Sequence, residues 1–197
     1  MKSYSKLIAR YAIIVALVVC SFTIDSFLTT RFLPIRAVIA TTVVVLSIVQ
    51  LFDFKSAVFT TTALGLVSFV FAYIFPNPAS EVMQKPVVSI LPRICIGLVS
   101  FSVLALMRKL TEKSANFFVK KYVTSSVAAA FGVITNTLLV LSAITYYTSE
   151  NVFNKLLSAI IAFNFPAELL AGIIVVPAVV NAVKDRIKAY GARNTGE

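Results

Sequence analysis

The chain has 197 residues, of which 59% are hydrophobic and only 13% are charged, and its mean hydropathy is +0.93. Soluble domains carry roughly 45–50% apolar and about 25% charged residues, so a soluble fold of this size could not bury so much apolar surface. We therefore expect an integral membrane protein. Six transmembrane helices would use about 120 residues, which leaves no room for a soluble ATPase domain, and the sequence contains no Gly-rich phosphate loop.

Six apolar segments follow one another along the chain. They are too long for the strands of a membrane barrel and lack the alternation that such strands show. We expect an all-α integral membrane protein, a bundle of six transmembrane helices that forms a single domain over residues 1–197. The segments run over Leu7–Ile24, Ala37–Leu51, Ser56–Phe75, Val88–Met107, Val123–Tyr147 and Leu156–Val183. The second segment is short, which suggests a helix that is tilted or shielded by its neighbours.

The net charge of +10 is distributed as in a membrane protein, because most basic residues flank the apolar segments. This distribution argues against a nucleic-acid partner. With the N-terminus inside, the cytoplasmic side carries Lys2, Lys6, Arg10, Lys55, Arg108, Lys109, Lys113, Lys120, Lys121, Lys184, Arg186, Lys188 and Arg193. The outer side carries Arg31, Arg36, Lys85 and Lys155. The positive-inside rule therefore predicts that both termini are cytoplasmic.

The chain offers few groups for catalysis or metal binding. It contains no histidine, which removes His-based triads and His metal sites. Its two cysteines, Cys20 and Cys95, lie in separate apolar runs, where we expect small buried residues rather than metal ligands. We therefore expect no catalytic residue, no metal and no cofactor.

Four polar residues lie inside the apolar segments: Arg93, Asn136, Asn164 and Glu168. An ionisable group at the centre of a membrane helix costs about 2.5–3.5 kcal/mol on insertion scales, and it usually faces the bundle interior. Asn164 and Glu168 are four residues apart, so they share one helical face. The predicted topology places all four toward the outer side, which indicates a polar binding site there.

These residues also have simpler interpretations. In one, Arg93 and Glu168 only pair with each other; in another, Asn136 only joins two helices. Pro92 and Pro166 lie close before two of the polar residues. A proline frees a backbone carbonyl, which either aims polar atoms at a cavity or merely kinks the helix.

The first segment carries a stripe of small residues, Ala9, Ala12 and Ala16, and small stripes allow close approach of helices in lipid. Gly65, Gly97, Gly132 and Gly172 lie within segments, where we expect close internal packing. Three connections are expected between segments: two outer loops over Asp25–Arg36 and Pro76–Pro86, and a basic cytoplasmic connection over Arg108–Lys121 along the membrane surface.

In length and in local motifs the chain resembles the substrate-binding S components of energy-coupling factor (ECF) vitamin transporters. The similar segments are LPRICIGL at 91–98, GVITNTLLVL at 132–141 and FNFPAELLAGIIVVPAVV at 163–180. Ala12 and Ala16 are similar to the AxxxA motif by which S components dock on their coupling protein. Within the family, the chain looks most like the pantothenate type, although S components for hydroxymethylpyrimidine and folate share related segments.

The resemblance implies a chain of the bacterial cell membrane that binds a vitamin from outside and works with a transmembrane coupling protein and two cytoplasmic ATPases. Such a chain is not itself an enzyme. For pantothenate, Arg93 would bind the carboxylate, and Asn136, Asn164 and Glu168 would meet the amide and hydroxyl groups. Phe163 or Phe165 would form an apolar wall.

Three other classes compete with this interpretation. A stand-alone secondary transporter would use Glu168 as a proton or sodium site, although the chain shows no inverted repeat of the kind common in such folds. An intramembrane enzyme would need a nucleophile and a base, for which a chain without histidine has few candidates. An assembly factor would use the polar residues only to join helices.

Overall fold

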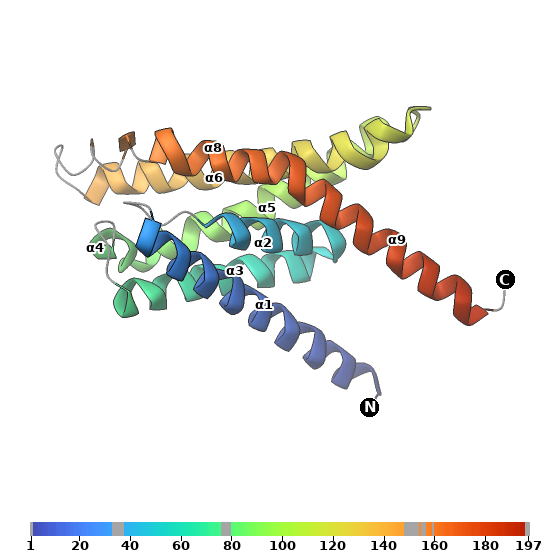
Figure 1. The fold of residues 1–197 in the computed structure, drawn as a ribbon, viewed down its shortest axis with the longest axis horizontal. Helices are drawn as coiled ribbons and strands as arrows, with labels where there is room; N and C mark the ends of the chain where they lie inside the picture. The colour runs from blue at the N-terminus through green and yellow to red at the C-terminus, as the bar shows by residue number, and fades with distance from the viewer. Residues whose placement is uncertain are drawn as a thin grey trace.

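The computed structural model is helical throughout residues 2–32, 38–75, 80–147, 154, 157–158 and 160–195, the part of the chain that it describes, apart from short turns. Figure 1 shows long helices packed side by side, with both chain ends on the same side of the bundle. The elements are α1 (Lys2–Phe32), α2 (Ile39–Leu51), α3 (Phe54–Ile74), α4 (Ser80–Met83), α5 (Pro86–Thr111), α6 (Thr124–Tyr147), α8 (Phe165–Leu170), α9 (Val176–Thr195) and the π-helical segments η1 (Val119–Val123), η2 (Ile160–Asn164) and η3 (Ala171–Val175).

Five helical stretches of the described chain are long and apolar enough to cross a membrane. They are Tyr4–Leu28, Phe54–Ile74, Pro86–Thr111, Val119–Tyr147 and Ile160–Lys188. The prediction of an all-α membrane protein is therefore confirmed. Five of the six predicted segments coincide with these stretches, whereas the second forms the shorter helix α2.

Helix α2 is the short element around which the others pack. Its 13 residues extend over about 20 Å at 1.5 Å per residue, less than the roughly 30 Å of a bilayer core. It contacts α1, α3, α5, α6, α8 and α9, and its side chains from Val45 to Gln50 are buried. The expectation of a short helix shielded by its neighbours is confirmed.

The first turn of α2 receives a side chain from α1. The Asp25 carboxylate accepts hydrogen bonds from the backbone N–H groups of Ala40 (3.1 Å) and Thr41 (2.7 Å). The prediction that an outer loop begins at Asp25 was wrong, because α1 continues to Phe32 and Asp25 is only 4% exposed. The two amides explain why Asp25 is buried in a helix rather than exposed in a loop, because they give its carboxylate hydrogen-bond partners inside the bundle.

Residues of α5 and α6 form hydrogen bonds with the polar groups at the last turn of α2. Arg108 donates to the Gln50 carbonyl oxygen (3.3 Å), and Gln50 Nε2 donates to the Ser125 carbonyl oxygen (3.0 Å). The Ser125 hydroxyl donates to Gln50 Oε1. A cation at a helix C-terminus and an anion at an N-terminus both complement the helix dipole, so α2 has a matched charge at each end.

The turn between α2 and α3 is tied to α1. Arg10 donates to the carboxylate of Asp53 and to the hydroxyl of Ser56, and its guanidinium lies 4.6 Å from the ring centroid of Phe52. The hydrogen bond from Arg10 lowers the pKa of Asp53 to about 2. The carboxylate is therefore ionised at neutral pH.

Glycines allow α3, α5 and α6 to pack closely. A Cβ atom at Gly65 of α3 would lie 2.9 Å from Ile90 Cα of α5, and one at Gly97 of α5 would lie 2.4 Å from Thr61 Oγ1 of α3. A Cβ atom at Gly132 of α6 would lie 2.9 Å from Leu46 Cδ2 of α2. The prediction of close packing is confirmed for these three. At Gly172 the nearest atom would be 3.4 Å away, an ordinary contact.

We expect Gly65→Ala to lower the thermal unfolding midpoint of the purified chain, because the new methyl group would meet the Ile90 backbone at 2.9 Å and overpacking costs about 1–3 kcal/mol. Gly172→Ala is the matched control, and its midpoint should stay unchanged or rise, since alanine is the better helix former. Equal midpoints for the two variants would contradict the packing of α3 on α5.

Candidate functional site

A cavity of about 130 Å³ lies inside the bundle on the N-terminal side of α2. A single water needs roughly 10–15 Å³ of such space, so the cavity has room for a small organic molecule. The four residues predicted from the sequence all line it: Arg93 from α5, Asn136 from α6, Asn164 from η2 and Glu168 from α8. The fold thus brings together side chains from distant parts of the chain.

Arg93 is oriented by its own helix. Pro92 cannot donate the backbone hydrogen bond that the Val88 carbonyl would accept in an α-helix, and Arg93 Nη1 donates to this oxygen instead (3.0 Å). Arg93 Nη2 lies 3.9 Å from the Met83 sulfur. The proline therefore frees an acceptor that fixes the guanidinium at the cavity wall. This is the first of the two roles considered for Pro92.

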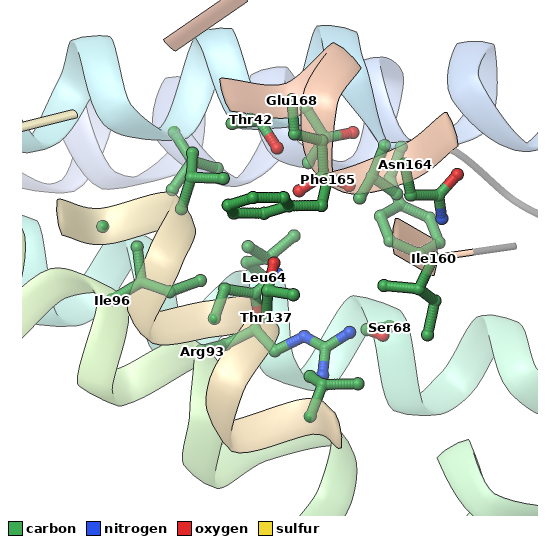
Figure 2. Close-up of a pocket in the computed structure, with 18 of the residues that line it drawn as sticks. Thr42, Leu64, Ser68, Arg93, Ile96, Thr137, Ile160, Asn164, Phe165 and Glu168 are labelled. Carbon is green, nitrogen blue, oxygen red and sulfur yellow. The ribbon is translucent and has the colours of Figure 1, made fainter. Parts of the chain in front are cut away.

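Glu168 lies on the opposite side of the cavity and is only 5% exposed. It belongs to the short helix α8, which the π-helical segments η2 and η3 flank. Val38, just before α2, lines the same cavity. Figure 2 shows Glu168 beside Thr42 on one wall and Arg93 on the other, with the ring of Phe165 projecting between them.

Arg93 and Glu168 do not form a direct ion pair. Across the described residues, ion pairs within 4.0 Å join Arg10 to Asp53 and Lys121 to Asp185, and none joins Arg93 to Glu168. The interpretation in which the two residues only pair with each other was therefore wrong for this structure. They still attract each other across the cavity, so a ligand with groups for both can lie between them.

The cavity also contains buried polar atoms that no protein group satisfies. Within the described part of the chain, Asn136 Oδ1 and Thr41 Oγ1 are inaccessible to solvent and have no hydrogen-bond partner. Buried polar atoms without a partner are rare in native proteins, and one explanation is a missing ligand or water. An acceptor such as Asn136 Oδ1 suits a ligand that donates hydrogen bonds.

The sequence analysis missed several lining residues. Thr41 and Thr42 of α2, Ser68 of α3 and Thr137 of α6 line the cavity, but threonines and serines are too common in membrane helices to signal a site. Of the two proposed aromatic walls, Phe165 lines the cavity, whereas Phe163 is 59% exposed and is not among the lining residues.

Ala12 and Ala16 are not among the residues that line this cavity. They lie on the outer surface of α1. They line a shallow apolar groove together with Tyr11, Val15 and Phe59, and both alanines are exposed. Cys20 lines the same groove and is exposed, so the expectation that it is buried was wrong. This face of α1 has no covering helix in the described chain. The second cysteine, Cys95, is half-buried.

Comparison of the chain with models of protein families, with curated proteins and with solved structures found no match. The chemistry of the site therefore rests on its own geometry. That geometry is a cavity with a cation and an anion on opposite walls and the Phe165 ring between them, lined also by the amide groups of Asn136 and Asn164.

We expect Asn136→Leu to raise the unfolding midpoint of the ligand-free chain. Leucine is similar in size, and it removes a buried acceptor without a partner, whose burial costs about 1–3 kcal/mol. The matched control is Asn181→Leu in α9, where Asn181 Nδ2 donates to the Lys121 carbonyl oxygen (3.1 Å). That variant should lower the midpoint, because it breaks a satisfied bond. A fall of equal size in both would show that Asn136 is structural.

Proposed function

We propose that the chain is the substrate-binding membrane subunit, or S component, of an ECF-type importer. It captures a water-soluble vitamin, and pantothenate is the first candidate. The observation that supports this proposal is the cavity between Arg93 and Glu168, whose opposite charges face each other without pairing. The carboxylate of pantothenate would bind Arg93. Its amide and hydroxyl groups would meet Asn136, Asn164 and Glu168, and its methyl groups would rest on Phe165.

The orientation of the cavity is consistent with capture from outside. The cavity lies at the N-terminal side of α2, whereas Arg108 contacts the C-terminal end of the same helix, and Arg108 belongs to the basic side of the chain. By the positive-inside rule that basic side is cytoplasmic. We infer a six-helix arrangement with cytoplasmic termini in a bacterial cell membrane, in which α2 contributes the second, shielded helix.

The direct test is calorimetric titration of the purified chain with pantothenate, hydroxymethylpyrimidine, thiamin and folate. Saturable binding of pantothenate alone would support the proposal. Selective binding of another of these vitamins would keep the S-component function and change the ligand. Absence of binding across the panel would count against the proposal and favour a chain whose polar residues only join helices.

We expect Arg93→Ala to abolish pantothenate binding while the variant still inserts into membranes. Removing one partner of a buried charge pair costs about 2–5 kcal/mol, which corresponds to a Kd at least roughly thirtyfold higher. The control is Arg10→Ala, because Arg10 contacts Asp53 and Ser56 rather than the cavity. Parent-like affinity in the purified Arg93 variant would make Arg93 a structural residue.

We further propose that the groove on α1 docks on a transmembrane coupling protein, which two cytoplasmic ATPases drive. This face is smooth and apolar, and nothing in the described chain covers it. The chain itself is expected to hydrolyse no ATP.

We expect Ala12→Trp or Ala16→Trp to block co-purification with the coupling protein and to leave vitamin affinity nearly unchanged, because the indole would fill the groove. Ile13→Trp is the control, since Ile13 is 60% exposed and lies outside the groove. Normal co-purification of the two alanine variants would contradict the docking site.

A stand-alone secondary transporter is the second candidate function. Glu168 favours it, because this carboxylate is buried without a direct ion pair in the described chain, as a proton or sodium site would be. The two functions differ in their need for partners. Concentrative uptake by the chain alone, reconstituted in vesicles without ATP, would favour the secondary transporter.

A further inference from the structure

Besides the four predicted site residues, Asp25 of α1 forms a notable contact: its carboxylate is hydrogen-bonded to the start of α2. Its carboxylate binds the amides of Ala40 at 3.1 Å and Thr41 at 2.7 Å. The side chain is 4% exposed and comes from a different helix. Each amide belongs to the first turn of α2, whose N–H groups have no partner inside their own helix.

This turn forms one wall of the cavity. Val38, Thr41 and Thr42 all line it, and Figure 2 shows Thr42 beside Glu168. The start of α2 therefore lies beside two carboxylates: Asp25 from α1, which binds its amides, and Glu168 from α8, which lines the same cavity. Carboxylates of like charge repel each other.

We propose that Asp25 is a positioning residue for this cavity: by holding the amides of Ala40 and Thr41, it fixes the first turn of α2 and keeps the Glu168 carboxylate available to the ligand. The part of the inference that concerns a ligand rests on the proposed function.

The physical reason is competition for the helix N-terminus. Free N–H groups and the positive end of the helix dipole attract the nearest anion. Asp25 occupies the two amides of the first turn. Without it, Glu168 is a buried carboxylate that lines the cavity beside this turn of the helix. It would turn from the cavity toward the vacated amides.

The first test needs no ligand. Amide hydrogen exchange of the peptide that contains Ala40 and Thr41 is measured in the parent, Asp25→Asn, Asp25→Ala, Glu168→Gln and the double variant Asp25→Ala/Glu168→Gln. We expect faster exchange in Asp25→Ala, an intermediate rate in Asp25→Asn, which keeps one acceptor oxygen, and parent-like protection of these two amides in Glu168→Gln. The double variant should exchange faster than Asp25→Ala, because the substitute carboxylate is lost as well.

The second test measures pantothenate affinity by calorimetry. Asp25→Ala should raise the Kd roughly tenfold or more, the loss expected for one or two hydrogen bonds to a charged group. Asp53→Ala is the matched control. It removes another carboxylate that links two helices, and this carboxylate precedes α3 at the other end of α2. The Asp53→Ala variant should bind pantothenate with the affinity of the parent, even if its unfolding midpoint falls.

The outcomes separate the two proposals. Unchanged amide exchange in Asp25→Ala, or a double variant no faster than Asp25→Ala, overturns the positioning role. Faster exchange with an affinity like that of Asp53→Ala overturns it too, because Asp25 would then only stabilise the fold. Absence of binding by the parent chain to any of the four vitamins contradicts the proposed function instead, and the exchange series alone then decides whether Asp25 and Glu168 compete for α2.

Discussion

The two ends of α2 must find partners at membrane depth, and this requirement organises the rest of the structure. The helix is too short to reach both membrane surfaces, and backbone groups without partners are costly away from water. Asp25 satisfies two N-terminal amides, whereas Arg108 satisfies a C-terminal carbonyl oxygen. Helices α1 and α5 are thus fixed relative to α2 by the charges that complete it, and the cavity lies beside its N-terminal end.

The cavity keeps opposite charges apart, although the surrounding protein would favour their pairing. Arg93 is held by a carbonyl of its own helix, and Glu168 lies on the opposite wall, beside the start of α2. No ion pair in the described chain joins the two. Two charges in this arrangement are complementary to a molecule that has an anionic group at one end and hydrogen-bond donors at the other.

The apolar segments and the four polar residues within them could be predicted, because a charge or amide stands out against a background of valine, leucine and isoleucine. Pro92 also gave a usable signal, since the carbonyl four residues before a proline is known from the sequence alone. Asp25 gave none. It lies at the end of an apolar run, where a loop is the simpler interpretation, and its partners come from another helix. Thr41 and Thr42 were missed because their role depends on how α2 faces its neighbours.

The bond between Arg93 and the Val88 carbonyl oxygen has a consequence for the biogenesis of the protein. Both groups lie within α5, five residues apart, so the bond can form as soon as this helix does. An arginine usually makes insertion of a helix into the bilayer costly. Here a partner in the same helix accompanies it from the start and offsets part of that cost. Glu168 differs, because the α2 residues beside it on the cavity wall are met only when the helices assemble.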